Sequence, residues 1–519
     1  MHSYIPWAIA GGVIVAAGLV LWLLARRRNA AGINTTATSR TLQVGALLTR
    51  SALRKLVLRA RQLLASRRRR QQLRSQYHVK SAQEAAQLMG NMKGVFMKLG
   101  QIISFADESL PSEARAMLRG LQKDAPPMAF ELVEAMLERE LGKRWREQVK
   151  HIDEEPLAAA SIGQVHEARL RDGRHVVFKV QYPDVDTAIR SDLRAAAGLG
   201  SIIQLFLPNA DHKAVLAELA ERLDDELDYR RELRNQQLFC QLWRGHPYIR
   251  VPEVYPELSA RRVLCQAYCR GMSFYEFLER SNARERELAV FVLNDFVFDS
   301  MHRFHVFNGD PHPGNYLFHE DGGVTFLDFG CIKYFDAAFL AHMQALNRAI
   351  VERDREAFDE HIHKLEIVLP GRPYAREMTW DFFQYHAAPF AEDAEFEFTH
   401  EYVARAKQVM NLKDLKMLNL PPDLLFFNRI TFGLNAIFAQ LGARANFQRL
   451  YRRYLYPAED IAPSLAHAGA ELPARFLPAR AEPAAVKALA APQAPSAATG
   501  YRQESAASAQ SESDTPTCA

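Results

Sequence analysis

Three oxygen-bearing side chains in the second half of the chain could together handle a phosphate group and a metal ion: Asp310, Asn315 and Asp328. Asp310 and Asn315 lie in one loop, which Pro311 and Pro313 hold extended. Asp328 follows across an expected hairpin, so that the amide and the carboxylate should meet at its two ends. Magnesium prefers such hard oxygen ligands and bridges nucleotide phosphates. We therefore predict that Asn315 and Asp328 bind Mg²⁺, and that Asp310 is catalytic and orients the attacking group.

An upstream lysine should pair with the phosphates, because Asp328 also opens an Asp-Phe-Gly motif of the kinase type. Lys179 lies in HVVFKVQYP, where β-branched and apolar residues indicate a strand. Its carboxylate partner should come from DDELDYRRELRNQ, which contains Glu226, Asp228 and Glu232. Glu226 and Glu232 do not share one narrow helix face. The spacing alone leaves open which of them pairs with Lys179.

The expected phosphate loop, PLAAASIGQVHEA (156–168), precedes that strand and has alanines where glycines would be usual. Its phosphate-binding residues would be Ala158, Ala159, Ala160 and Ser161. Alanine leaves the backbone N–H groups available to phosphate but restricts φ more than glycine does. We therefore expect nucleotide binding that is altered but not lost.

Two other features are interpreted as structural. His312 is expected to fix its loop through a hydrogen bond rather than to bind a metal. The cysteines are odd in number and contain no CxxC pair, which argues against a disulfide framework or a zinc site; they are Cys240, Cys265, Cys269, Cys331 and Cys518.

Strand patterns concentrate around these motifs. Residues 167–183 predict two strands around Asp172-Gly173, which is a strong hairpin signal. Residues 261–268 predict another strand, and residues 315–330 predict a pair around Asp321-Gly322-Gly323. The strands should form a small lobe.

Helical periodicity dominates the rest of the body. Residues 129–149 and 212–239 predict amphipathic helices, and residues 331–455 are almost wholly helical. A large helical lobe should therefore follow the strand-bearing one.

The N-terminus predicts a membrane anchor with a basic flank, residues 1–28. Residues Ile5 to Ala25 carry no charge and would span roughly the 30 Å hydrocarbon core of a bilayer as a helix. Arg26, Arg27 and Arg28 follow the span, which places the body in the cytoplasm of a bacterial host. A cleaved signal peptide is the alternative; an organelle transit peptide fits the apolar opening poorly.

Residues 29–79 predict a basic amphipathic linker. Residues 1–80 contain 15 Lys and Arg and no acidic residue, so all 61 acidic residues lie in the remainder, which is net acidic. We expect the arm to lie on an anionic membrane surface and the body not to bind nucleic acid. A solvated linker is the alternative. The Ala-, Pro- and Ser-rich residues 457–519 predict a disordered tail.

Taken together, the motifs resemble the UbiB/AarF family of atypical kinase-like proteins, which includes the mitochondrial coenzyme Q kinases. The resemblance covers roughly residues 80–455 and rests on MKLGQ (97–101), PLAAASIGQVH (156–166), VFKVQYP (177–183), ELDYRREL (226–233), DPHPGN (310–315) and LDFG (327–330).

The resemblance implies an α+β, mostly helical, two-lobe fold of the atypical protein-kinase type. A helical extension (80–150) would precede an N-lobe (151–270) and a C-lobe (271–456). The extension would carry a Lys-x-Gly-Gln motif, here Lys98 and Gln101, over the site where a protein substrate would dock.

The resemblance also assigns roles. Glu226 and Asp228 would face the extension, which leaves Glu232 as the partner of Lys179. The chain departs from the family at Ala267, where a Glu is usual, so adenine contacts should differ. Its membrane span also lies at the N-terminus rather than the C-terminus.

The function implied is a membrane-associated ATPase, or an atypical small-molecule or lipid kinase, that uses ATP and Mg²⁺ and supports ubiquinone biosynthesis or lipid handling. Its partners would be anionic or isoprenoid lipids and quinone-biosynthesis enzymes, at a bacterial inner membrane or, in a eukaryote, the mitochondrial inner membrane. One alternative is a non-catalytic nucleotide-sensing scaffold, which the alanine-rich loop favours. The other is an antibiotic-type phosphotransferase, which the Lys-x-Gly-Gln motif and the membrane span disfavour.

Overall fold

The computed structural model describes residues 128–160, 162–187, 189–190, 226–309, 311–405, 409, 418–419, 421–459 and 461–476. All of them belong to one compact unit, Met1–Ala479. The expected membrane span, the basic linker and most of the extension lie outside these residues, as do Lys98, Gln101, Ser161 and Asp310. Among the helices that the structure describes, none is both long and apolar enough to cross a bilayer.

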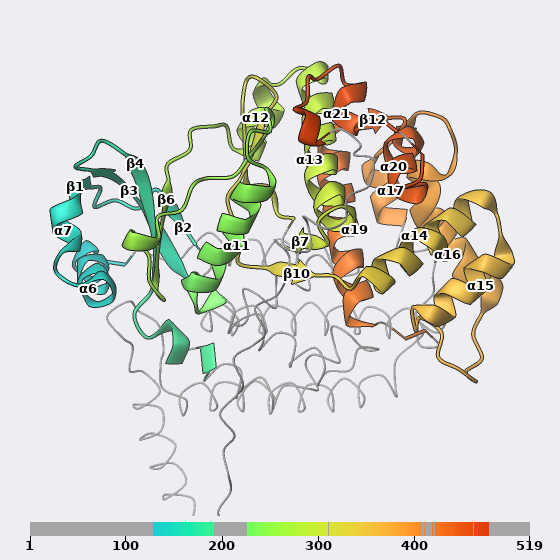
Figure 1. The fold of residues 1–519 in the computed structure, drawn as a ribbon, viewed down its shortest axis with the longest axis horizontal. Coiled ribbons are helices and arrows are strands. Elements are labelled where there is room, and N and C mark those ends of the chain that lie inside the picture. Colours follow the sequence, from blue (N-terminus) through green and yellow to red (C-terminus); the bar gives the residue numbers. More distant parts are fainter. Residues whose placement is uncertain are drawn as a thin grey trace, which may run out of the picture. The chain divides into compact units, whose positions relative to one another are not determined.

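An antiparallel sheet carries the lysine and the alanine-rich loop (Figure 1). Its strands follow the order β1-β3-β4-β6, and β2 also pairs with β3. The predicted Asp172-Gly173 hairpin is confirmed: it joins β3 to β4, and Gly173 has a φ of 92°. The strands are β1 (Val149–Ile152), β2 (Ala158–Ala159), β3 (Gly163–Leu170), β4 (His175–Gln181) and β6 (Val263–Ala267).

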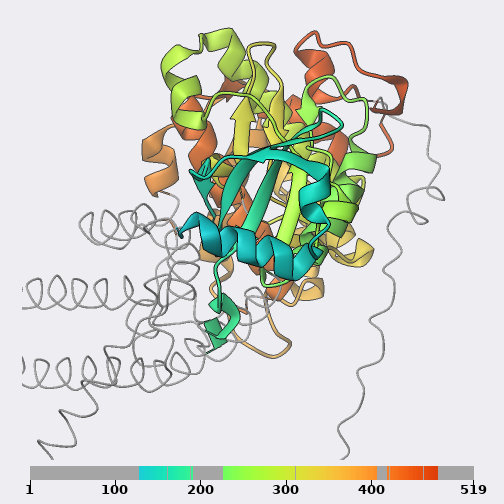
Figure 2. The same ribbon diagram turned by 90° about the vertical axis from the view of Figure 1, so that its left-hand side faces the viewer.

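Two helices cover one face of this sheet, as the cyan ribbon in Figure 2 shows. The prediction of one continuous helix over 129–149 was wrong. The segment is divided into α6 (Phe130–Leu141) and α7 (Trp145–Gln148) at Gly142, whose φ of 74° ends the first helix. Val133 and Leu137 of α6 pack with the apolar side chains of β4 in one core cluster.

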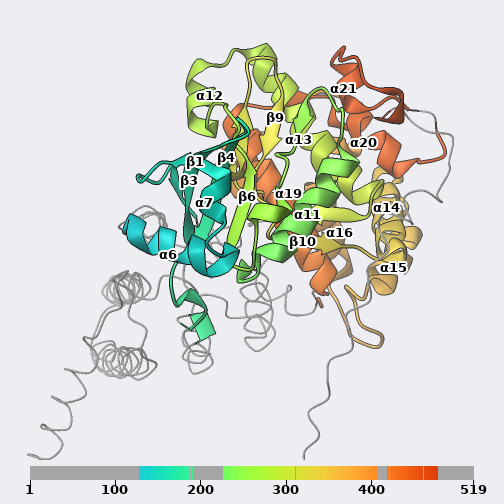
Figure 3. The same ribbon diagram turned by 60° about the vertical axis from the view of Figure 1, so that its left-hand side comes forward.

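Helix α11 (Tyr229–Leu242) contacts β6 and supplies the carboxylate side of the site (Figure 3). The helix predicted over 212–239 does not continue through this point. Asp228 has an extended backbone and caps α11 by accepting a hydrogen bond from the N–H of Arg230, at 3.1 Å. A side chain that satisfies a free N–H group at a helix start favours a new helix there.

Among the described residues, five short strands lie around the segment that contains Asn315 and Asp328. β8 (Tyr316–Phe318) and β9 (Val324–Phe326) form the hairpin predicted around Asp321, and β5 (Ile249–Arg250) pairs with β9 in parallel. β7 (Val306–Asn308) pairs with β10 (Ile332–Tyr334). The residues between these two strands, 309–331, include Asn315 and Asp328.

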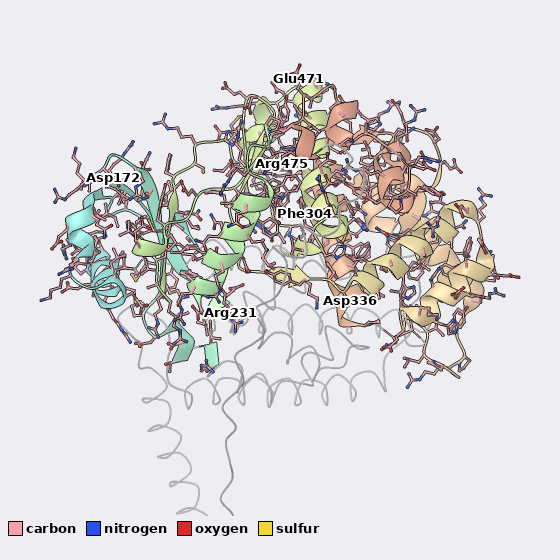
Figure 4. All side chains as sticks on the ribbon, viewed as in Figure 1. Asp172, Arg231, Phe304, Asp336, Glu471 and Arg475 are labelled. Carbon is pink, nitrogen blue, oxygen red and sulfur yellow. The ribbon has the colours of Figure 1, made fainter. Side chains whose placement is uncertain are left out.

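The helical part is built around α13 (Ala283–His302), in which every residue from Ala289 to Met301 is buried. The predicted helical character of 331–455 is confirmed over the described residues, apart from the short strands β10, β11 (Phe396–Glu397) and β12 (Arg444–Ala445). The remaining helices are α12 (Phe274–Arg280), α14 (Ala337–Glu352), capped by Asp336 (Figure 4), α15 (Arg355–Lys364), α16 (Arg376–Ala391), α17 (His400–Arg405), α19 (Pro422–Leu441) and α20 (Phe447–Leu455).

The tail predicted to be disordered from residue 457 is instead packed up to residue 476. It contains α21 (Ser464–His467), which contacts α13, and a 3₁₀ turn, η3 (Ala474–Phe476). Leu465 is fully buried, and Phe476 stacks on Trp243 with ring centroids 5.5 Å apart. Trp243 also contacts Phe304, which Figure 4 labels together with Arg475. A few apolar anchors fix this segment despite its Ala- and Pro-rich composition.

Candidate active site

The centre of the site is an ion pair between Lys179 of β4 and Glu232 of α11. The Lys179 Nζ lies 2.8 Å from Oε1 and 3.0 Å from Oε2 of Glu232. The exposed fraction is 16% for the lysine side chain and 4% for the glutamate, so water screens the pair poorly. The tertiary structure therefore selects Glu232, and not Glu226, as the partner of Lys179.

Asp328 completes a three-charge cluster. Its Oδ2 lies 3.7 Å from Lys179 Nζ, and its Oδ1 accepts a hydrogen bond from the N–H of Gly330 at 2.9 Å. The Asp328 side chain is about one-third exposed, at 33%, so it faces both the lysine and the solvent. The ring of Tyr229 lies 5.1 Å from the same ammonium group.

The charge balance of this cluster favours a bound cation. Burial alone would lower the pKa of Lys179, but Glu232 and Asp328 outweigh burial and hold that pKa well above its usual value. Burial raises the pKa of Glu232 to about 7; Lys179 opposes this shift and Asp328 adds to it. Two carboxylates thus share one ammonium group, and a divalent cation beside Asp328 would offset the excess negative charge.

The backbone of Asn315 is hydrogen-bonded to Leu327, the residue before Asp328. Its carbonyl oxygen accepts a hydrogen bond from the N–H of Leu327 at 2.9 Å, so the two ends of the β8–β9 hairpin meet as predicted. An amide oxygen and a carboxylate are the donors that Mg²⁺ accepts while it keeps waters and substrate phosphates. No group of three or more His, Cys, Asp or Glu side chains suited to a metal occurs in the described residues. The donor types at positions 315 and 328 fit Mg²⁺, which would take its remaining ligands from water and substrate phosphates.

The loop before Asn315 is held by its own side chains. His312 Nδ1 accepts a hydrogen bond from the N–H of Gly314 at 3.0 Å, which confirms the loop-fixing interpretation of this histidine. Asp310 itself lies outside the described residues. Its neighbour Pro311 packs so closely on α19 that a Cβ at Gly433 would lie 2.6 Å from Pro311 Cγ.

The alanine-rich loop lies in register with the lysine. Ala158 pairs with Val165 of β3, and Val165 pairs with Lys179 of β4, so the three residues form one row across the sheet. Residues in such a row present their side chains to the same face. Ala158 and Ala159 are exposed on β2, and the N–H of Ala160 donates to the carbonyl of Gly163 at 2.9 Å.

Gly163, the first residue of β3 after the alanine-rich loop, allows β3 to lie close to β4. A Cβ at position 163 would lie 2.1 Å from the carbonyl oxygen of Val180, which is far inside contact distance. The glycine is therefore required for close approach of β3 to β4 rather than for a special φ.

The other two acidic candidates have local roles in the described structure. Asp228 caps α11 and pairs with the Arg230 guanidinium at 2.7 Å. Burial would raise its pKa, but the hydrogen bonds from Arg230 outweigh burial and lower it. The Glu226 backbone carbonyl accepts a hydrogen bond from Gln181 Nε2 at 3.1 Å, which joins the end of β4 to the residues just before α11. Their expected role toward the extension involves residues outside the described part and stays a prediction.

Two asparagines that the sequence reasoning missed hold the Asp-Phe-Gly segment. Asn235 Nδ2 donates to the Phe329 carbonyl at 3.0 Å, and Asn308 Nδ2 donates to the Asp328 carbonyl at 2.5 Å. Asn235 follows Glu232 at i,i+3 on α11, a spacing that could have indicated a shared face.

The last residue of β6, Ala267, and the residue after it use their backbone N–H groups within the protein. The N–H of Ala267 donates to the Glu253 carbonyl at 2.8 Å, and the N–H of Tyr268 donates to the His175 carbonyl at 2.9 Å. The rings of His175 and Tyr268 also stack, with centroids 4.0 Å apart. These two N–H groups are therefore not offered to a nucleotide base.

Comparisons with known proteins found several similar chains. The family model described as the ABC1 atypical kinase-like domain matches residues 120–362. The chain is 30% identical over 323 residues to atypical kinase COQ8B, mitochondrial, of Rattus norvegicus, covering 58% of this chain and 61% of that protein. It is 28% identical over 368 residues to atypical kinase COQ8, mitochondrial, of Saccharomyces cerevisiae, covering 70% of this chain and 73% of that protein.

A third relative is AarF domain-containing protein kinase 1 of Gallus gallus, 28% identical over 56% of this chain and 58% of that protein. The match thus spans less than two thirds of some of these relatives. Among solved structures, the complex of Rv3197 with erythromycin from Mycobacterium tuberculosis has a TM-score of 0.56 and 29% identity, covering 76% of this chain and 99% of that one.

Proposed function

The chain belongs to the UbiB/AarF family of atypical kinase-like proteins, and we propose that it uses Mg-ATP to transfer the γ-phosphate to a small molecule, a lipid or water. The family implies ATP binding. The single observation that carries the proposal is the buried pair of Lys179 and Glu232 with Asp328 3.7 Å from the lysine. Kinase-type phosphoryl transfer requires this combination of a held lysine and an Asp-Phe-Gly carboxylate.

Each residue of the site would have its own role toward Mg-ATP. Lys179, held by Glu232, would bind and orient the nucleotide phosphates. Asp328 and Asn315 would hold Mg²⁺, which when bound offsets the negative charge of the phosphates. Asp310 would orient the attacking hydroxyl or water. The alanine-rich loop would contact the phosphates through N–H groups other than those of Leu157 and Ala160, which donate to carbonyls of β3.

The cellular role that we propose is support of ubiquinone biosynthesis or lipid handling at a membrane. The support is the family resemblance and the apolar, basic N-terminal sequence. Anionic lipid at the basic arm, isoprenoid lipid and quinone-biosynthesis enzymes are the partners that fit this role. This role is tested by comparing the quinone profiles of a deletion strain and its parent by mass spectrometry. Unchanged levels of quinones and their precursors would exclude a role in ubiquinone biosynthesis.

A non-catalytic nucleotide sensor is the second candidate, because the alanines of β2 restrict the phosphate loop. ATP hydrolysis by the full-length protein distinguishes the two functions. We expect slow Mg²⁺-dependent turnover that rises with anionic liposomes and is abolished in Asp328→Asn. Asp321→Asn is the matched control, since Asp321 lies in the same β8–β9 hairpin and pairs with Arg250 outside the site. Equal turnover in wild type and Asp328→Asn would leave only the sensor.

A further inference from the structure

One buried amide side chain holds the backbone at the start of the described structure. Gln164 of β3 is 1% exposed. Its Oε1 accepts a hydrogen bond from the N–H of Met128 at 2.9 Å, and its Nε2 donates to the carbonyl of Met128 at 3.2 Å. Both backbone polar groups of Met128 are therefore satisfied by a residue 36 positions later in the chain.

The second hydrogen of the Gln164 amide has a partner as well. His166, two residues along β3, places Nε2 2.7 Å from Gln164 Nε2 and Nδ1 2.8 Å from the Asp153 carbonyl. An amide nitrogen only donates, so His166 Nε2 must accept, and Nδ1 must carry the hydrogen that goes to Asp153. Burial lowers the pKa of His166, which keeps this ring neutral. Every donor and acceptor of the Gln164 amide group therefore has a partner, which fixes the orientation of that group.

The backbone of the same residue faces the phosphate loop. Gln164 pairs with Ala159 in the two-residue strand β2, whose sheet neighbour among the described strands is β3. Hydrogen bonds flank this pairing: Leu157 N–H donates to Val165 at 2.8 Å, and Ala160 N–H donates to Gly163 at 2.9 Å. A strand this short depends on its partner for its position.

We propose that Gln164 is a positioning residue that couples the alanine-rich loop to the point where the preceding chain enters the fold, at Met128. Its side chain fixes Met128 on the α6 face of β3, and its backbone fixes Ala159 at the edge of the same strand. A displacement of the chain at Met128 therefore reaches the loop through one residue. The coupling is a property of the fold; its effect on ATP rests on the proposed function.

The test uses Gln164→Met in the full-length protein, because methionine has a similar length but neither donates nor accepts as an amide does. Val176→Ala is the control for a general loss of stability. Val176 is fully buried in β4, and its strand partners are Ala168 and Ala267, not Gln164. His166→Leu is the second variant, which removes the outer partner and keeps both Met128 hydrogen bonds.

The first readout is hydrogen exchange without nucleotide. We expect the Leu157 and Ala160 amides to exchange about tenfold faster in Gln164→Met, together with faster exchange of the peptide that contains Met128. His166→Leu should show a smaller increase at the same amides, and Val176→Ala should leave them unchanged. Unchanged exchange at Leu157 and Ala160 in Gln164→Met, or an equal increase in Val176→Ala, would overturn the proposal.

The second readout is nucleotide binding, measured as the KM for ATP beside kcat. A positioning role predicts that Gln164→Met raises KM about fivefold or more and changes kcat less than KM. An equal fall of kcat in Gln164→Met and Val176→Ala would contradict it. If the wild type neither binds nor hydrolyses ATP, the proposed function fails, whereas the exchange readout still decides the coupling.

Discussion

Lys179 and Glu232 join the sheet to α11 through a 2.8 Å ion pair that is almost completely removed from solvent. The pair fixes the distance between β4 and the helix that also holds the Phe329 carbonyl through Asn235. Because Asp328 lies 3.7 Å from the same ammonium group, the lysine connects both halves of the candidate site.

The pair should show strong coupling in a double-mutant cycle. Lys179→Met leaves the buried Glu232 without its ammonium partner, and Glu232→Leu leaves Lys179 with only the more distant Asp328. Each should lower the free energy of unfolding by about 3 kcal/mol. The double variant should lose at least ~1 kcal/mol less than the sum of the two, because no charge is then stranded. Urea denaturation measures the cycle; strictly additive losses would show that the pair contributes no coupling.

The exposed pair of Arg280 and Glu276 is the control, where Glu276→Ala should cost less than about 1 kcal/mol.

Ala158→Gly should alter nucleotide binding. Glycine can reach positive φ, which allows the loop N–H groups to converge on phosphate, so we expect tighter binding of ATP. The measurement is the nucleotide-induced rise in melting temperature at equal ATP. Identical rises in wild type and variant would exclude a role for this alanine, and Ala445→Gly in β12 controls for a general glycine effect.

The C-terminal segment should respond to pH through Asp295 of α13. The Asp295 carboxylate pairs with Arg453 at 2.8 Å and accepts a hydrogen bond from the Leu465 N–H at 3.2 Å. Burial raises its pKa from the ordinary 3.8 to about 7, although Arg453 opposes the shift. A carboxyl whose folded pKa is raised stabilises the fold most at low pH, and this contribution is lost as pH rises from about 4 to about 7.

Asp295→Asn should therefore flatten the pH dependence of unfolding in that window. Urea titrations of both proteins from pH 4 to about 8 measure the difference in slope. A parallel pair of curves would mean that Asp295 titrates alike in the folded and unfolded states. Asp321→Asn is the control: Arg250 outweighs burial there and lowers the pKa, so the contribution of Asp321 changes below about pH 4 and the variant should leave the slope in this window unchanged.

Phe476 should anchor the segment that composition suggested was disordered. The ring is 4% exposed and stacks on Trp243. Phe476→Ala should lower the free energy of unfolding by about 3 kcal/mol. Tyr275→Ala is the control, since that ring is 67% exposed and should cost less than about 0.5 kcal/mol. Equal melting temperatures for the wild type and Phe476→Ala would mean that the segment adds no stability.

Several elements could be predicted from local pattern because their causes are local. Asp172-Gly173 forms the hairpin turn that its residue types predict, and the strand pattern in HVVFKVQYP gives β4. His312 fixes its loop through a residue two positions away. Two of the errors lay at helix boundaries, where Gly142 and Asp228 each ended or began a helix inside an apolar period.

The sequence by itself determined the residue types of the site, their order along the chain and the resemblance to the UbiB/AarF family. The tertiary structure alone decided how Gln164 holds Met128 and that Phe476 reaches Trp243, and it confirmed the pairing of Lys179 with Glu232, which only the family resemblance had implied. These contacts join residues that are distant in sequence and depend on the angle at which packed elements meet. Spacing along one helix or strand contains no information about that angle, so it can nominate Glu226 and Glu232 but only packing can choose between them.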